Sequence, residues 1–71
     1  MLANIIKKYL DDNGIKYSFI ASEVGMSIKV FSAMLSGNRK MVAEEFIDIC
    51  RALKTDPNYF AEKVKQIKQA I

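Results

Sequence analysis

Gly14, Gly25, Gly37 and Pro57 are the only glycines and the only proline in the chain, and they divide it into five segments. Glycine and proline are the residues that most often mark turns and helix ends. Within each segment, apolar residues recur at the i, i+3 and i+4 spacing of one helix face, and none alternates with the period of a strand. With 71 residues, the chain is too short for two domains or a barrel. We therefore predict an all-α bundle of five short helices around one core.

The five helices are expected at residues 2–13, 17–24, 28–36, 42–53 and from 57 to near the C-terminus. Ser27 is a suitable N-cap for the third helix, and Ser18 is a candidate cap near the start of the second. Asp56 followed by Pro57 is a strong start signal for the fifth, because aspartate caps well and proline suits the first helical position.

The residue inventory excludes several kinds of site. The chain has no histidine and a single cysteine, Cys50, so it has no internal disulfide, no His/Cys zinc site and no Ser-His or Cys-His catalysis. The adjacent carboxylates Asp11/Asp12 and Glu44/Glu45 point about 100° apart on a helix, so neither pair forms a two-carboxylate site. We expect no enzyme activity, no metal, no cofactor and no small-molecule substrate.

No apolar run approaches the roughly 20 residues needed to span a bilayer. Residues 1–8 lack the long apolar region of a signal peptide, and their lysines follow the apolar residues instead of preceding them. We therefore expect a cytoplasmic protein without a membrane partner.

The second and third segments have the physical features of a helix-turn-helix. A helix of about eight residues ends at Gly25, a three-residue turn follows, and a second helix begins after Ser27. The small Ala21 permits close approach of the two helices, and Phe31 and Met34 are placed to fill the joint. The second helix of such a motif can enter a DNA major groove.

The sequences IASEVGMS at residues 20–27 and FSAMLSGNRK at 31–40 resemble the signature of the phage Cro/CI repressor family, also called lambda-repressor-like or XRE. The resemblance continues through residues 44–46, 49–53 and 56–60, and it covers roughly residues 3–60. It implies a five-helix DNA-binding domain over residues 1–60, with residues 61–71 as a C-terminal helical extension. It also implies a transcriptional regulator, commonly a repressor, that binds double-stranded DNA as a homodimer.

The resemblance also assigns roles by position. Residues 28–35 would be the recognition helix, and the residues facing the groove would be Ser27, Ile28, Lys29, Ser32 and Ala33. Contacts with the DNA backbone would come from Lys16, Tyr17 and Ser18, and from the loop residues Ser36, Asn38, Arg39 and Lys40. Tyr17 could equally cover the edge of the core.

The chemistry of these residues agrees in part with the roles that the resemblance assigns to them. Lys29 can bond guanine or phosphate, the serines can donate or accept, and Ile28 and Ala33 can pack on thymine methyls. Arg39 and Lys40 suit phosphate contacts. Residues 1–40 carry six basic and three acidic side chains, so the positive excess lies partly on this half of the chain.

A protein-interaction module, such as an antitoxin or adaptor, is the alternative. Lys29 is the only long polar side chain between Ser27 and Ser36, which leaves little for direct base recognition. Phe19 falls on the outer face of its helix, where it suits a partner contact. In the extension, Val64, Ile67 and Ile71 form an apolar stripe, which could pack on the core, form a dimer contact or lie on a membrane surface.

Overall fold

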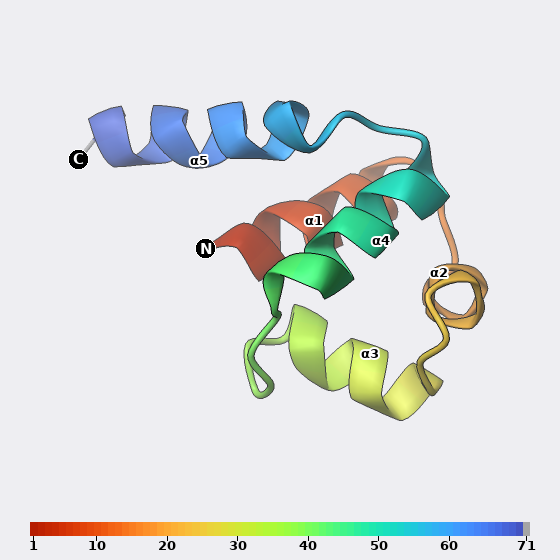
Figure 1. Cartoon of the computed structure of the whole chain (residues 1–71). Helices are drawn as coiled ribbons and strands as arrows, with labels where there is room; N and C mark the ends of the chain where they lie inside the picture. The colour runs from red at the N-terminus through yellow and green to blue at the C-terminus, as the bar shows by residue number, and fades with distance from the viewer. Residues whose placement is uncertain (71) are drawn as a thin grey trace.

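The computed structural model describes residues 1–70, which form five α-helices and no strand (Figure 1). The helices are α1 (Leu2–Asp12), α2 (Tyr17–Glu23), α3 (Ile28–Leu35), α4 (Ala43–Leu53) and α5 (Pro57–Ala70). The all-α prediction is confirmed. Four predicted ends differ by one residue, because Asn13, Val24, Ser36 and Val42 are caps rather than helical residues. Ile71, the last residue of the predicted apolar stripe, lies outside the described residues.

The prediction for the start of the second helix was wrong in one detail. Ser18 lies inside α2, and the N-cap is Lys16, which makes no side-chain capping bond. By contrast, the Ser27 hydroxyl accepts the backbone N–H of Val30 at 3.2 Å, and Asp56 Oδ1 accepts that of Asn58 at 2.9 Å. Both of these caps were predicted from the sequence.

One hydrophobic core joins all five helices. Its fully enclosed members are Ile6, Leu10, Ile20, Ala21, Phe31, Met34, Leu35, Ile49, Cys50 and Phe60. Burial raises the pKa of the Cys50 thiol, which accords with the predicted role of this residue as a small core hydrophobe. Since no polar or charged side chain among the described residues is buried, the core is held by apolar packing.

Helices α1 and α4 run through the middle of the molecule, with α3 on one side of them and α5 on the other (Figure 1). Helix α2 joins α1 to α3 and packs against both α3 and α4. The N-terminus and the C-terminal end of α5 lie at the same end of the molecule (Figure 1). The exposed side of α3 and helix α5 therefore lie on opposite sides of the molecule (Figure 1).

The connection between α2 and α3 is a tight turn closed by two backbone hydrogen bonds. The N–H of Met26 donates to the carbonyl of Ala21 at 2.8 Å, and that of Gly25 donates to Ser22 at 3.2 Å. This is the Schellman pattern, which requires a left-handed residue after the helix. Gly25 supplies it with a φ of 74°, and α4 ends in the same way with Lys54 at a φ of 55°.

Gly25→Ala is expected to lower the free energy of unfolding by about 1 kcal/mol. The effect comes from the backbone alone, because a Cβ at this position would meet no atom within 4 Å. For a domain of this size the thermal midpoint should fall by about 4–8 °C, measurable by circular dichroism. Lys54→Gly is the matched reverse change and should raise the midpoint. An unchanged midpoint in Gly25→Ala would contradict the assignment of strain to this turn.

Within residues 1–70, no single helix is long and apolar enough to cross a membrane. Helices α2 and α3 satisfy the criterion only when taken together, and they are bent by 109° relative to one another.

Candidate nucleic-acid interface

Helix α3 is anchored on one face and exposed on the other. Phe31, Met34 and Leu35 are buried, whereas Ile28 and Lys29 on the outer face are exposed. Ile28 is 48% exposed, which is high for a large apolar side chain. Of the other predicted groove-facing residues, Ser27 and Ser32 are exposed and Ala33 is half-buried. All five predicted positions of this group therefore have at least partial access to solvent.

The loop after α3 is ordered by bonds back to that helix. The N–H groups of Asn38 and Arg39 both donate to the carbonyl of Ala33, at 2.9 and 3.2 Å. The Ser36 hydroxyl donates to the carbonyl of Ser32 at 2.9 Å and also lies 3.2 Å from that of Ala33. These contacts hold the loop residues 36–40 beside the C-terminal end of α3, so the structure brings these two predicted groups together.

The two basic residues of this loop differ in their surroundings. The Arg39 guanidinium forms a bidentate ion pair with Glu45 of α4, with N···O distances of 2.9 and 2.8 Å. Hydrogen bonding to Arg39 lowers the pKa of Glu45, and the pKa of Arg39 is raised in return. Lys40 is exposed and forms no ion pair with any described residue.

Tyr17 is held by α1 rather than projecting into solvent. Its hydroxyl donates to Asp11 Oδ1 at 2.7 Å, and its ring packs edge-on against Phe31 with centroids 6.2 Å apart. Asp11 also accepts from Lys7 at 3.2 Å. The hydrogen bond from Tyr17 is the largest cause of the lowered pKa of Asp11. The ring therefore takes the core-edge position that was the alternative to a DNA contact, while Lys16 and Ser18 on either side are exposed.

Replacing Tyr17 by phenylalanine is expected to raise the pKa of Asp11 toward its ordinary value. A lowered carboxyl pKa stabilises the fold above the unfolded-state pKa, and this contribution is lost as the pH falls through the folded pKa. The variant should therefore be less stable than the wild type near pH 7, and the two should converge near pH 2. Carboxyl NMR titration and urea unfolding at both pH values measure this.

Tyr59→Phe is the matched control, since the Tyr59 hydroxyl donates no hydrogen bond among the described residues. It should leave the pKa of Asp11 unchanged. An identical Asp11 titration in Tyr17→Phe and wild type would show that the hydrogen bond is absent in solution.

Basic residues without an ion pair within residues 1–70 lie near α3 and also elsewhere, at Lys54 and at Lys63, Lys65 and Lys68 of α5. Lys7, Lys8 and Arg51 are each paired with a carboxylate on their own helix. Lys16, Lys29 and Lys40, all predicted to contact DNA, form no ion pair within residues 1–70. Three exposed positive charges therefore lie in the regions that the sequence assigned to DNA.

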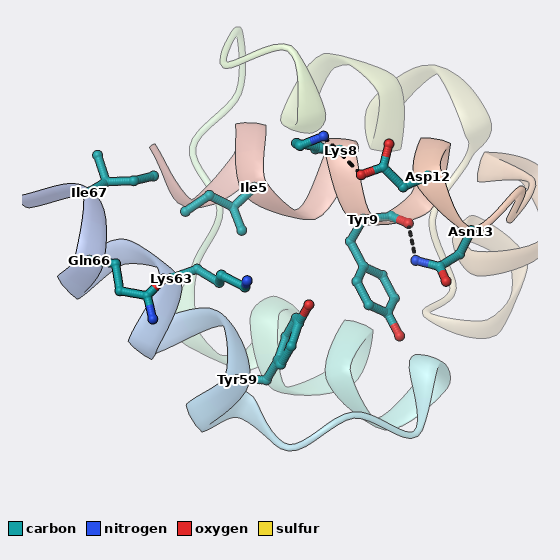
Figure 2. Close-up of a pocket in the computed structure, with 9 residues that line it drawn as sticks. All are labelled: Ile5, Lys8, Tyr9, Asp12, Asn13, Tyr59, Lys63, Gln66 and Ile67. Carbon is teal, nitrogen blue, oxygen red and sulfur yellow. Dashed lines mark hydrogen bonds and ion pairs between the residues drawn. The ribbon is translucent and has the colours of Figure 1, made fainter. Parts of the chain in front are cut away.

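A second surface, which the sequence indicated only through its apolar stripe, lies between α1 and α5. A pocket of about 290 Å³ is bounded by Ile5 and Tyr9 of α1 and by Tyr59 and Ile67 of α5 (Figure 2). The two tyrosine rings meet edge-to-face at 5.7 Å, and Lys63 Nζ lies 5.4 Å from the centre of the Tyr59 ring. The Lys8–Asp12 ion pair stands at its rim (Figure 2).

An adjoining hollow opens at the other edge of α5, lined mainly by Met1, Leu2, Phe46 and Val64. Met1 and Ile67 are 51% and 40% exposed. Phe60, one turn before the predicted stripe, is fully buried, whereas Val64 in the stripe is half-buried and Ile67 is open to solvent. Packing on the core accounts for the first part of the predicted stripe only.

No group of three or more His, Cys, Asp or Glu side chains in residues 1–70 is placed to hold a metal ion. No protein-family model, curated protein or solved structure matches this chain.

Proposed function

We propose that this chain is a small Cro/CI-like transcriptional regulator that binds double-stranded DNA with α3 in the major groove. The observation that carries the proposal is the α2–α3 unit, in which two short helices bend by 109° at a tight turn. This value lies within the roughly 90–120° typical of helix-turn-helix units. The second helix is fixed to the core by one face and presents Ile28, Lys29 and Ser32 on the other.

The proposed contacts divide into two groups. Lys29, with Ser27 and Ser32, is suited to base edges or nearby phosphates, and Ile28 and Ala33 to thymine methyl groups. Lys16, Ser18, Ser36, Asn38 and Lys40 are suited to the DNA backbone, because they are short polar or cationic side chains at exposed positions. With one long polar side chain on α3, recognition would depend partly on DNA shape.

The decisive experiment is a salt series of fluorescence anisotropy with random-sequence duplex DNA. Micromolar binding that falls steeply with salt is expected, because released counterions dominate such binding. A folded sample that does not bind at low salt would overturn the proposal. Selection of a preferred sequence from a random pool would then test for an operator.

We further propose that the regulator is a homodimer formed through the end of the molecule that carries Met1, Leu2, Val64 and Ile67. In Figure 1 the N-terminus and the C-terminal end of α5 lie together at one end of the molecule, and α5 lies on the side of α1 and α4 opposite α3. A two-fold axis here would leave both α3 helices facing the same way, as two half-sites about 34–36 Å apart require. In this scheme residues 1–60 form the DNA-binding domain and residues 61–71 the extension. Helix α5 crosses that boundary without a break.

Ile67→Glu is expected to raise the dimer dissociation constant by at least about tenfold, because it places a charge in the apolar contact. Light scattering over a concentration series measures the change. At concentrations where both proteins are monomeric, the thermal midpoint should change little, since Ile67 is 40% exposed in the monomer. Gln69→Glu adds the same charge at an exposed position of the same helix and should leave the dimer intact. Equal effects of the two variants would argue against this interface.

The protein-interaction alternative has one observation in its favour. Phe19 is 56% exposed on the outer side of α2, more than any other large apolar side chain in residues 1–70. A partner that covers α2 would bury this ring. Under this alternative, Phe19→Ser would abolish partner capture, whereas under the DNA-binding proposal it would leave DNA affinity unchanged.

A further inference from the structure

The Arg39–Glu45 ion pair connects the loop after α3 to the start of α4. Nη1 and Nη2 of Arg39 face Oε1 and Oε2 of Glu45 at 2.9 and 2.8 Å, so the guanidinium meets the carboxylate along one edge. Nη1 also lies 3.4 Å from the carbonyl of Lys40 and 3.4 Å from Met34 Sδ. With both of its hydrogens directed at these groups, Nη1 has no donor left for another molecule.

Glu45 has a second role in the same cluster. Its Oε1 accepts the backbone N–H of Val42, the N-cap of α4, at 3.0 Å. The valine side chain has no acceptor, so only the glutamate half of a capping box is present. The Glu45 side chain is 17% exposed, compared with 40% for Arg39. One carboxylate thus caps α4 and holds Arg39, which fixes both ends of the segment 39–42.

The electrostatics separate Arg39 from Lys40. Arg39 and Glu45 together carry no net charge, whereas Lys40 is an exposed cation with no ion pair in the described chain. Phosphate binding releases counterions in proportion to the net cations that contact the DNA. Moving Arg39 onto a phosphate would break a bidentate pair and leave the Glu45 carboxylate near the DNA.

We infer that Arg39 is a positioning residue of the DNA-binding loop, and that Lys40 makes the phosphate contact of that loop, assisted by Asn38. The inference rests on the proposed DNA-binding function. It changes the role that the sequence suggested for Arg39, because only one of the two neighbouring basic residues is assigned a contact with DNA. Arg39 acts through Glu45 on the loop backbone, and Lys40 acts directly on the DNA.

The test compares two variants in salt-titrated anisotropy on random-sequence duplex DNA, at a temperature where both are folded. Arg39→Gln/Glu45→Gln removes one positive and one negative charge, so the net charge is unchanged. We expect its affinity for DNA to fall by about three- to tenfold. Without the ion pair, one or two loop side chains must become ordered when DNA binds, and this costs binding free energy. Its salt slope should equal that of the wild type. Lys40→Gln should lower the slope by about 0.9.

Each other outcome has a definite meaning. A slope lowered by about 0.9 in the double variant would show that Arg39 contacts phosphate, and would overturn the inference. Unchanged affinity and slope in the double variant would also overturn it, because Arg39 would then serve the fold alone. An unchanged slope in Lys40→Gln would remove the assigned phosphate contact. Absence of binding by the folded wild type would overturn the proposed function and this inference with it, and is distinct from the other results.

Discussion

Replacing Phe60 by alanine is expected to lower the free energy of unfolding by about 3–5 kcal/mol. Phe60 is fully buried, and its ring meets Tyr9, Tyr59 and Phe46 edge-on at centroid distances of 5.4, 5.2 and 6.2 Å. These partners come from α1, α5 and α4. The cavity left by the ring would therefore lie where three helices meet. At about 0.05–0.15 kcal/mol per residue, a chain of this length has a total stability of about 4–11 kcal/mol.

The loss is therefore comparable with the whole stability of the domain, and a substantial unfolded fraction is expected at 37 °C. Urea unfolding followed by circular dichroism measures it. Phe19→Ala is the matched control, because it removes the same atoms from a side chain that is 56% exposed. Its effect should stay within about 0.5 kcal/mol. Similar losses in the two variants would mean that the aromatic cluster does not hold α5 to the bundle.

Helix positions could be predicted because their causes are local. The five segments follow from a few turn residues and an apolar repeat, and both Ser27 and the Asp56–Pro57 pair mark helix starts by their own chemistry. The one-residue differences at helix ends have a local cause as well. At the ends of α1, α2 and α3, the residue before a left-handed glycine serves as the cap, so each helix ends one position earlier than the apolar pattern suggests. At the start of α4, Val42 takes the extended conformation of an N-cap, so that helix begins one position later.

The partners of the candidate site residues could not be predicted, because they depend on how helices are placed in space. Tyr17 meets Asp11 across the turn between α1 and α2, and Arg39 meets Glu45 across the loop between α3 and α4. Each carboxylate has several basic or hydroxyl groups within similar sequence distance. Residue type and spacing therefore assigned both Arg39 and Lys40 to phosphate contacts. Only the side-chain geometry separates the paired residue from the unpaired one.

Changing Lys29 and Lys40 together to glutamine is expected to weaken binding to random-sequence DNA by about 60-fold at 0.1 M salt. Neither lysine has an ion pair among the described residues, so each can replace counterions on a phosphate. The slope of log K against log salt concentration falls by about 0.9 for each lost phosphate contact, or about 1.8 for two. Between a 1 M reference and 0.1 M salt, this change in slope corresponds to the roughly 60-fold loss of affinity. Anisotropy from about 0.05 to 0.2 M salt resolves both the slope and the affinity.

Lys63→Gln/Lys65→Gln is the matched control, since it removes the same charge from α5, on the side of the bundle opposite α3 (Figure 1). If the binding surface includes α3 and its following loop, this control should keep most of the slope. Equal loss in both variants would mean that DNA responds to overall charge, and it would contradict a defined interface. Lys29→Gln alone should also alter the preferred sequence, whereas Lys40→Gln should weaken all sequences alike, because the proposed complex places α3, and not the following loop, at the base edges in the groove.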